Sequence, residues 1–310
     1  MESKLFLSLI DEKRCFDVLR SIRWPEGVNC PQCNSTHYWT DYEEEPKLQY
    51  KCCQCGQWWT DFTDTIFEGT HLPLSYWFMV VQWFYEGKSA LWVSKELCIG
   101  RHTVEQMYQR IRNDLWTKRI SEKLSGITEA DEVYISCGEK GTKQIERPAR
   151  KRGLKRKGRG TWDSDKPPVV GLVERANAKV RLEVCKNAKK VTCNELIERH
   201  VEPGSTVNTD EWGGYNDLSK KGYDHKTVCH SAGEYARDED GDGINEVHVN
   251  TMEGIWSLLR QYIRTFRGVC KKYLHLYVNA FEFLHNLKRR TSDGFLGLLT
   301  TILTPHESGT

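Results

Sequence analysis

Four cysteines in the first sixty residues constrain the fold of this chain more than any other feature. They form two C-x2-C pairs, Cys30-Pro-Gln-Cys33 and Cys52-Cys53-Gln-Cys55, with eighteen residues between the pairs. Each pair lets two thiolates converge on one ion, and four thiolates close a tetrahedron around Zn²⁺ with no open coordination position. We therefore predict one structural zinc ion per chain, held by Cys30, Cys33, Cys52 and Cys55, with Cys53 pointing away from the ion.

The rest of the composition is typical of a large protein with reduced thiols. At 310 residues the chain is long enough for more than one domain, and its other eight cysteines are scattered. The longest apolar stretch, residues 77–85, is about half as long as a membrane span requires. The N-terminus lacks the small-residue cleavage site of a signal peptide. We expect a cytoplasmic or nucleoid protein, nuclear in a eukaryotic host, with no membrane partner.

A basic segment is hidden by the formal net charge of only +2. Residues 140–159 hold ten Lys or Arg residues and one Glu, with glycines between them. We interpret 140–160 as an inserted loop that contacts DNA phosphates, although a solvated run of charges is the alternative. The residues expected to contact DNA here are Arg150, Lys151, Arg152, Lys155, Arg156, Lys157 and Arg159.

Helical patterns occupy two places in the N-terminal part of the chain. Apolar residues at helical spacing indicate an amphipathic helix within residues 1–25 and three helical pieces between residues 74 and 116, with Ser75 and Thr103 as N-caps of the first and third pieces. The second and third pieces, separated at Gly100, have the proportions of a helix-turn-helix, and an ordinary pair of helices is the alternative. The recognition helix of that motif reads base edges from its first turns. The side chains expected to contact DNA are Arg101, His102, Thr103, Gln106 and Arg110.

Beyond Gly126 the pattern changes to short β-like runs at 133–136, 168–175, 179–185, 205–210 and 225–229. A helix is expected at 193–201, and two more at 250–266 and 272–290. An acidic stretch, 238–243, resembles the start of a calcium loop, but Val249 stands where that loop needs a glutamate, so we interpret it as a solvated loop. The second half of the chain is therefore predicted to be an α/β domain.

Three acidic residues lie at the ends of these elements. We expect Asp131 at the head of a β-run, Asp210 at the end of another and Glu253 in the first turns of a helix. Carboxylate oxygens are the ligands that two catalytic cations require for phosphoryl chemistry. Either neighbour, Glu132 or Glu211, could be the ligand instead, since only one of two adjacent strand residues faces the site. Glu253 could also be a helix-start charge that the helix dipole favours.

Arg260 lies on the same helical face as Glu253, two turns later, where it could reach a bound phosphate. His248 and Asn250 lie close to Glu253 in sequence and are candidates to support the metal ligands.

In this arrangement the chain resembles the DDE transposases of zinc-ribbon insertion sequences, the ISXO-like group related to the Merlin transposons of animals. The matching pieces, in the order of that family, are CPQC and CCQC, ADEVYI, KGRG with KPPVVGLVER, TDEWGGY, HVNTMEGIWSLLR and YLHLYVNAFEFLHN. They cover roughly residues 15–290.

The resemblance implies a multidomain α/β protein whose RNase H-like catalytic core, a mixed sheet with flanking helices, follows a zinc ribbon and a helix-turn-helix-like region. It assigns Asp131, Asp210 and Glu253 as the catalytic triad, binding two Mg²⁺ or Mn²⁺ ions. The expected domains are 1–70 for the N-terminal helix and zinc ribbon, 71–125 for the helical DNA-binding region, 126–292 for the catalytic domain and 293–310 for a C-terminal tail.

The implied function is metal-dependent DNA cleavage and strand transfer by a homodimer or larger assembly, acting on double-stranded terminal inverted repeats and target DNA. Arg260 replaces the family's usual lysine and keeps its charge. Ala280, Leu284 and Leu287 replace a Glu and two Arg residues that many relatives carry. A nuclease that cleaves without joining, a domesticated DNA-binding regulator without catalysis, and a zinc-ribbon scaffold protein are the alternatives.

Overall fold

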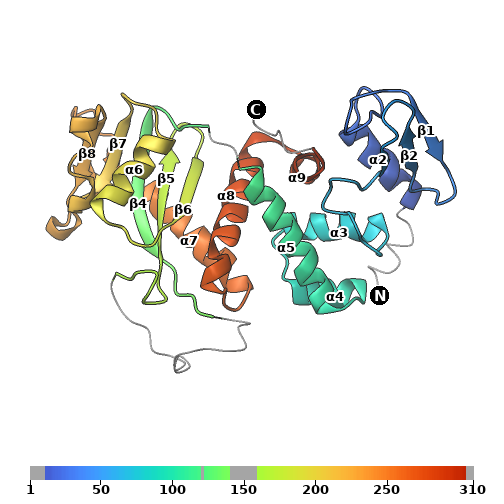
Figure 1. Cartoon of the computed structure of the whole chain (residues 1–310). Helices are drawn as coiled ribbons and strands as arrows, with labels where there is room; N and C mark the ends of the chain where they lie inside the picture. The colour runs from blue at the N-terminus through green and yellow to red at the C-terminus, as the bar shows by residue number, and fades with distance from the viewer. Residues whose placement is uncertain (1–10, 120–121, 140–158, 305–310) are drawn as a thin grey trace. The chain divides into compact units, whose positions relative to one another are not determined.

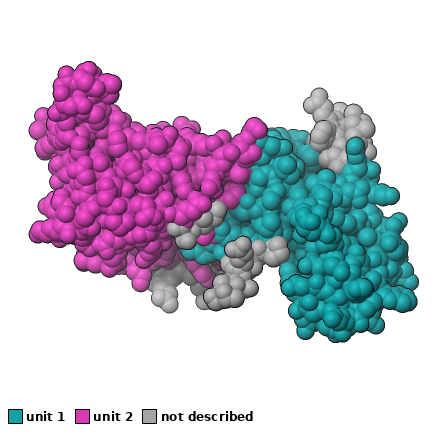
Figure 2. Space-filling model, turned by 90° about the horizontal axis from the view of Figure 1, so that it is seen from above, with its two compact units in different colours: residues 1–118, 293–310 teal, residues 119–292 magenta. Residues whose placement is uncertain are grey.

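The computed structural model describes residues 11–119, 122–139 and 159–304 (Figure 1). Contacts divide the chain into two compact units, coloured separately in Figure 2. The first comprises Met1–Lys118 with Asp293–Thr310, and the second comprises Arg119–Ser292. Within the described ranges, no helix combines the length and apolar character that a membrane span needs.

The first unit begins with α2 (Glu12–Arg23), which lies within the region predicted to form an amphipathic helix. Asp11 caps it by accepting a hydrogen bond from the backbone N–H of Lys13. Its buried face carries Cys15, Phe16 and Leu19. A three-stranded antiparallel sheet follows, made of β1 (Tyr38–Asp41), β2 (Gln49–Cys52) and β3 (Trp58–Thr60). The sequence pattern indicated only short polar segments there, because cysteines and turns interrupt the strands.

A fully buried carboxylate, that of Asp61, joins α2 to this sheet. It accepts hydrogen bonds from Arg20 Nη2 at 2.7 Å, from the backbone N–H of Leu48 at 2.7 Å and from the Tyr50 hydroxyl at 3.0 Å. A buried charge is tolerated only when it is paired and hydrogen-bonded in this way. The contact therefore fixes the helix against the zinc ribbon.

Three helices follow the ribbon: α3 (Leu74–Tyr85), α4 (Ala90–Leu97) and α5 (Arg101–Thr117). The predicted N-caps Ser75 and Thr103 are wrong. α3 begins one residue before Ser75, and the Glu12 carboxylate accepts from the backbone N–H groups of its first turn. α5 begins at Arg101, with Gly100 at its N-cap. At the start of α3, the carboxylate of Glu12, distant in sequence, thus caps the helix in place of the predicted Ser75 hydroxyl.

Residues 293–310, interpreted from sequence as a tail, contain the helix α9 (Gly294–Leu303). This helix belongs to the first unit, where it packs against α2, α3 and α5. Lys118 Nζ donates to the carbonyls of Thr301 and Ile302 at its C-terminal end. The close approach of Tyr85 to Gly294 leaves no space for a side chain there. The apolar run of α9 is short, and its partners lie more than 170 residues earlier in the chain.

The second unit is built on a five-stranded mixed sheet in the order β6-β5-β4-β7-β8. Its strands are β4 (Ile127–Tyr134), β5 (Pro168–Glu174), β6 (Lys179–Val184), β7 (Thr206–Asp210) and β8 (Asp224–Val228). The first three form an antiparallel meander, and β7 and β8 run parallel to β4. A separate two-stranded ribbon, β9 (Ala236–Arg237) with β10 (Val247–His248), follows β8.

Helices cover both faces of this sheet (Figure 1). On one face, α6 (Lys190–His200) packs through Cys193, Leu196 and Ile197. On the other face lie α7 (Asn250–Thr265) and α8 (Leu274–Arg290). Every residue of β5 is buried, as expected for a strand covered on both sides. The predicted mixed sheet with flanking helices is therefore present.

The predicted start of β4 was wrong by several residues. The strand begins at Ile127, so Asp131 lies in its interior and not at its head. The sequence disguises this start because Thr128 and Glu129 are polar and yet fully buried. The other four predicted strands agree with the observed ones to within one residue at each end.

A buried ionic network fastens α8 to β6. The Glu282 side chain, only 3% exposed, pairs with Arg181 at 3.1 Å and Arg119 at 2.9 Å. It also accepts a hydrogen bond from the backbone N–H of Leu182 at 2.8 Å. Removing one member of such a network leaves buried charges with fewer partners.

We predict that Glu282→Gln destabilises the second unit by roughly 3 kcal/mol, because it removes the carboxylate that pairs with the buried Arg181 and one of the two carboxylates that pair with Arg119. Glu122→Gln is the matched control, since Glu122 is 49% exposed and pairs with Lys179 and Arg290 at the surface. The control should cost less than about 1 kcal/mol. Urea unfolding of the full chain measures both, and equal losses in the two variants would contradict the assignment.

Candidate functional site

The four predicted zinc ligands converge in the first unit. One sulfur from each of Cys30, Cys33, Cys52 and Cys55 lies within 4.8 Å of the others. The Sγ atoms of Cys30 and Cys55 are 3.5 Å apart, and those of Cys33 and Cys52 are 3.6 Å apart. Four sulfurs at the usual Zn–S distance of about 2.3 Å would be about 3.8 Å apart at the corners of a tetrahedron. The cluster therefore fits one zinc ion with no position left for a substrate.

Backbone geometry prepares one of these thiols to lose its proton. The N–H groups of Cys55 and Gln54 donate to Cys52 Sγ at 3.4 and 3.3 Å. These hydrogen bonds, that from Cys55 first, lower the pKa of Cys52 to about 6. The adjacent Cys53 is exposed and is not part of the sulfur cluster.

Strand pairing brings two of the three candidate catalytic acids together. β4 and β7 are parallel neighbours in which Glu129 pairs with Asn208. Continuing this register by two residues brings Asp131 level with Asp210, and residues level on adjacent strands share a face of the sheet. Glu253 lies in the first turn of α7, which covers this same face. The structure therefore gathers Asp131, Asp210 and Glu253 from three elements.

The environment of the Asp131 carboxylate raises its pKa to about 6. Burial is the main cause, and the negative charges of Asp210 and Glu253 act in the same direction, whereas a hydrogen bond from Trp256 acts against them. That bond joins the indole Nε1 to Asp131 Oδ2 at 2.8 Å. A carboxyl whose pKa rises because other acids crowd it gains from a bound cation.

Gly171 makes room for this hydrogen bond. It lies on β5 directly opposite Asp131 in the antiparallel ladder. A Cβ atom at this position would lie 2.3 Å from the Trp256 ring and 2.5 Å from the Met252 methyl group. The indole can therefore reach the Asp131 carboxylate only because the β5 residue opposite Asp131 has no side chain. The sequence had not singled out Gly171 or Trp256, and their role depends on a contact across three elements.

Glu132, one alternative ligand, points to the opposite face of the sheet. Its carboxylate accepts hydrogen bonds from Tyr215 and Tyr134 at 3.2 and 3.5 Å. Arg159 Nη2 lies 3.8 Å from it. Burial raises the pKa of Glu132 to about 7, with smaller contributions from the charges of Asp131 and Asp210. This acid is held by its own partners, away from α7.

The other alternative, Glu211, has a structural role. Its carboxylate accepts from the backbone N–H groups of His230 and Ser231 at 2.8 and 3.0 Å, where it closes the turn after β8. Backbone hydrogen bonds lower its pKa to about 2. Of each adjacent pair, Asp131 and Asp210 are therefore the acids placed to share a site.

The three acids do not form one tight cluster. Among the described residues, the groups whose ligand atoms all lie within 4.8 Å of one another are the four cysteines and the set Asp238, Asp240 and Glu246. The second set belongs to the exposed acidic loop between β9 and β10, where Asp238 accepts from the backbone N–H groups of Gly241 and Gly243.

A buried glutamate that sequence reasoning did not select positions the start of α7. Glu129 is fully buried and lies two residues before Asp131 on the same face of β4. It accepts from the Thr251 hydroxyl at 2.8 Å and from the Met252 backbone N–H at 2.9 Å. Arg175 Nε donates to it at 2.7 Å. The turn that carries Glu253 is thus tied to the strand that carries Asp131.

The residues predicted to support the site lie around α7. Asn250, Glu253 and Arg260 are all on its exposed face, so the predicted alignment of this face is confirmed. His248 Nδ1 lies 3.2 Å from Glu129 Oε1 and accepts a hydrogen bond from the backbone N–H of Asn250 at 3.3 Å. Burial and the charge of Arg175 lower the pKa of His248. We therefore regard this contact as one made by a neutral imidazole and not as an ion pair.

The residues predicted to contact DNA have different surroundings. Arg101 and His102 are exposed at the start of α5, and Arg101 pairs with Glu105 at 2.7 Å. Thr103 is half-buried and Gln106 exposed. Arg110 donates to the backbone carbonyls of Ile66 and Glu68, so it fastens α5 to the segment after the ribbon.

From the basic segment, only Arg159 lies within the described residues, and its guanidinium stacks 4.3 Å from the Trp212 ring centroid. Arg150, Lys151, Arg152, Lys155, Arg156 and Lys157 lie outside the described residues.

We predict that Cys33→Ser abolishes stoichiometric zinc binding, whereas Cys53→Ser retains one zinc per chain. Three thiolates and a hydroxyl hold zinc far less tightly than four thiolates, and Cys53 lies outside the cluster. Metal analysis by mass spectrometry after dialysis measures the zinc content. A full zinc content in Cys33→Ser would refute the ligand set.

Comparison with known proteins identifies the family of each half of the chain. Residues 123–286 match the family model of the ISXO2-like transposase domain, and residues 10–57 match that of the transposase zinc-ribbon domain. The chain is 31% identical over 285 residues to an uncharacterized protein in the transposable element ISH50 of Halobacterium salinarum, which covers 91% of this chain and 94% of that protein. It is 26% identical over 108 residues to an uncharacterized transposase-like protein of Haemophilus influenzae, which covers 35% of this chain and 81% of that protein. The resemblance inferred from the motifs is confirmed, and the chain belongs to the ISXO2-like transposase family, with a transposase zinc ribbon preceding its transposase domain.

Proposed function

We propose that this transposase cuts and joins DNA strands at a carboxylate centre made of Asp131, Asp210 and Glu253, on an RNase H-like core. One observation carries the proposal. Asp131, half-buried in the middle strand of the sheet, has its pKa raised by the charges of Asp210 and Glu253, in addition to the larger effect of desolvation. The sheet supports the RNase H-like assignment, since an antiparallel meander continues into two parallel strands with helices on both faces.

The donor set fits hard divalent cations. Three carboxylates supply several oxygen ligands, which Mg²⁺ and Mn²⁺ prefer, and cysteine and histidine are absent from the triad. When two such ions are bound by Asp131, Asp210 and Glu253, they activate the attacking oxygen and stabilise the leaving 3′ oxygen. The chain's own part is to hold these three carboxylates ionised and in place.

Trp256 orients the central carboxylate. Its indole N–H occupies Asp131 Oδ2, which fixes the rotation of the carboxylate and favours the ionised form. Glu129 and Arg175 hold the first turn of α7, and with it Glu253, against β4. Arg260, two turns further along the exposed face of α7, is placed to steady a DNA phosphate. Orientation of this kind lowers the barrier because the ligands need no rearrangement during reaction.

DNA binding is assigned to the first unit and to the basic segment. The exposed start of α5, with Arg101, His102 and Gln106, follows a short helix and a tight turn in which Cys98 has a left-handed conformation. A short helix, a tight turn and a second helix with an exposed start support a helix-turn-helix, whose second helix enters the major groove. The substrates are the terminal inverted repeats of the element and a target duplex. Because two ends must be cut and joined, we assign a dimer or larger assembly on DNA.

A DNA-binding protein without catalysis is the second candidate. The observation that favours it lies on α8, where Ala280 and Leu284 are buried and Leu287 is half-buried, at positions that carry charge in many relatives. One assay separates the candidates: labelled duplex bearing the element's ends is incubated with the full chain and Mg²⁺ or Mn²⁺. Nicking with strand transfer supports the transposase, nicking alone a nuclease, and binding without either the regulator.

We predict that Asp131→Ala, Asp210→Ala and Glu253→Ala each lower the rate of nicking and strand transfer by a factor on the order of 10³ or more, since each removes ligands worth several kcal/mol in the transition state. Glu211→Gln is the matched control for Asp210, because its acid closes a turn outside the site. The control should keep activity within a few fold of the parent. Activity retained in any of the three alanine variants would remove that residue from the triad.

We predict that the acid limb of the pH–activity profile reflects Asp131 and moves in Trp256→Phe. The carboxylate must lose its proton to bind a cation, so activity at subsaturating Mn²⁺ should fall about tenfold per pH unit below about pH 6. Phenylalanine keeps the ring but loses the indole N–H, which raises the pKa of Asp131. The limb should then shift upward by roughly one pH unit. An unchanged limb with a uniformly lower rate would indicate a packing role for Trp256.

A further inference from the structure

One face of the zinc-ribbon sheet packs on the aromatic core of the ribbon, and the other, outer face points away from that core. Strand alternation sends Tyr50 and Trp59 inward, where they stack with ring centroids 5.4 Å apart. The alternate residues point outward and are paired across the strands. Trp39 pairs with Lys51, and Lys51 pairs with Trp58, so the three form a continuous row. We call this the Trp–Lys–Trp row.

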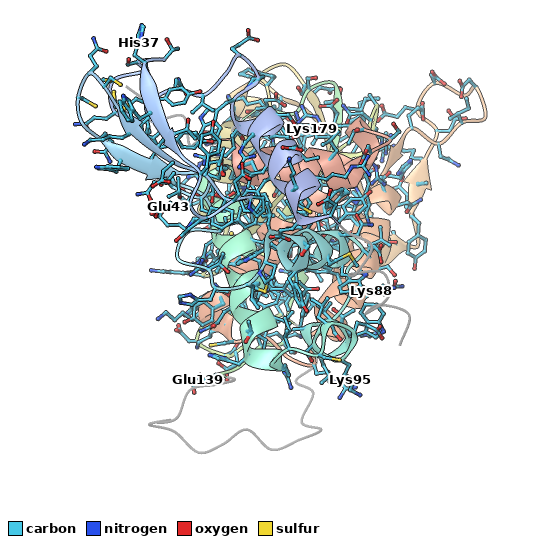
Figure 3. The ribbon with its side chains drawn as sticks, turned by 90° about the vertical axis from the view of Figure 1, so that its right-hand side faces the viewer. His37, Glu43, Lys88, Lys95, Glu139 and Lys179 are labelled. Atoms are coloured by element: carbon cyan, nitrogen blue, oxygen red, sulfur yellow. The ribbon has the colours of Figure 1, made fainter. Side chains whose placement is uncertain are left out.

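The two tryptophans of this row are unusually accessible. Trp39 is 76% exposed and Trp58 is 49% exposed. The opposite face already has a complete aromatic core, so these rings are not required to stabilise the ribbon. Together with Tyr42, which is 61% exposed, they line a groove of about 1,070 Å³ on the ribbon. His37 and Glu43, which flank β1, are labelled in Figure 3. Adjacent exposed aromatics in a groove mark a binding surface.

Lys51 lies between the two rings. Its ammonium group is 5.0 Å from the Trp58 ring centroid. Adjacent strands are about 4.8 Å apart, so the two tryptophans lie roughly 10 Å apart with a cation between them. A nucleic-acid strand with unstacked bases presents a matching order of base, phosphate and base. Aromatic side chains on a sheet bind such bases by stacking, because every base has a flat face.

A second row on the same face is polar. Asp41 pairs with Gln49, and Gln49 pairs with Thr60. This row lies two residues along each strand from the Trp–Lys–Trp row. Carboxylate, amide and hydroxyl groups are the side chains that hydrogen-bond base edges. The charge of this face is also informative, since Asp41 and Glu43 accompany the single lysine in the groove. Such a surface is a poor clamp for duplex phosphates, so its affinity must come mainly from bases.

We infer that the outer face of the zinc ribbon binds unpaired DNA, with bases stacked on Trp39 and Trp58 and the intervening phosphate on Lys51. The inference rests on the proposed function, because strand cleavage at the element's ends exposes strands that can unpair. It gives the zinc ribbon a substrate distinct from the duplex assigned to α5.

The test compares two labelled strands that differ only in their bases. The full chain, in buffer with zinc but without Mg²⁺ or Mn²⁺, is titrated into a fluorescent twenty-nucleotide oligo(dT) and into an abasic strand of equal length. The parent should bind oligo(dT) at least about tenfold more tightly than the abasic strand. The double variant Trp39→Ala with Trp58→Ala should lose that preference, and Trp39→Phe with Trp58→Phe should keep most of it. Lys51→Ala should weaken binding to both strands.

Tyr235→Ala is the matched control, because Tyr235 is 61% exposed but belongs to the second unit. It should leave both affinities unchanged. Zinc content and unfolding midpoints establish that the double alanine variant is folded. Equal binding of the two strands by the parent, or an unchanged preference in the double alanine variant, overturns the inference. So does loss of self-association with unchanged DNA binding, which would make the row a contact between copies of the chain. Since no catalytic metal is present, failure here is independent of the cleavage assay.

Discussion

The candidate catalytic face depends on the buried carboxylate of Glu129. Strand β4 can place Asp131, and α7 can present Glu253, but nothing in either element alone sets the distance between them. Glu129 does so by binding the first turn of α7 directly, while Arg175, the residue after β5, neutralises its charge and reaches the β10 carbonyl of His248. An ionised group in such a buried position is tolerated only because each of its oxygens has partners. Burying this charge is unfavourable in itself. The contacts that satisfy it also hold the strand and the helix of the triad in a fixed geometry.

The sequence predicted the elements of the second unit well, because their hydrophobic patterns are local. The strands at 168–174 and 179–184 are continuously apolar or alternate, and turn residues bound them. Where the pattern failed, a tertiary partner had overridden local preference. Near the start of β4, the buried Glu129 is satisfied by Arg175 and α7, and α3 is capped by Glu12 from another helix. Such partners lie tens of residues away and leave no local signature.

For the site, sequence reasoning named the acids but not what holds them. Asp131 and Asp210 each have an acidic neighbour, and strand alternation alone states that one of each pair faces the site without saying which. The partners distinguish them, since Tyr215 holds Glu132 and backbone N–H groups hold Glu211. Trp256 and Gly171 are further examples. An indole on α7 and a missing side chain on β5 have meaning only once the helix is laid across the sheet.

The return of α9 to the first unit has a consequence for how the protein is made. A ribosome delivers the zinc ribbon and α2 to α5 early, yet the helix that packs against α2, α3 and α5 is synthesised only after the whole second unit. Domains generally fold as units as they emerge during synthesis. Here the second unit can close while the first still exposes the apolar surface that awaits Leu298 and Leu299. A nascent chain therefore completes its carboxylate-bearing unit before its zinc-ribbon unit, and the finished first unit exists only in molecules that already contain the second.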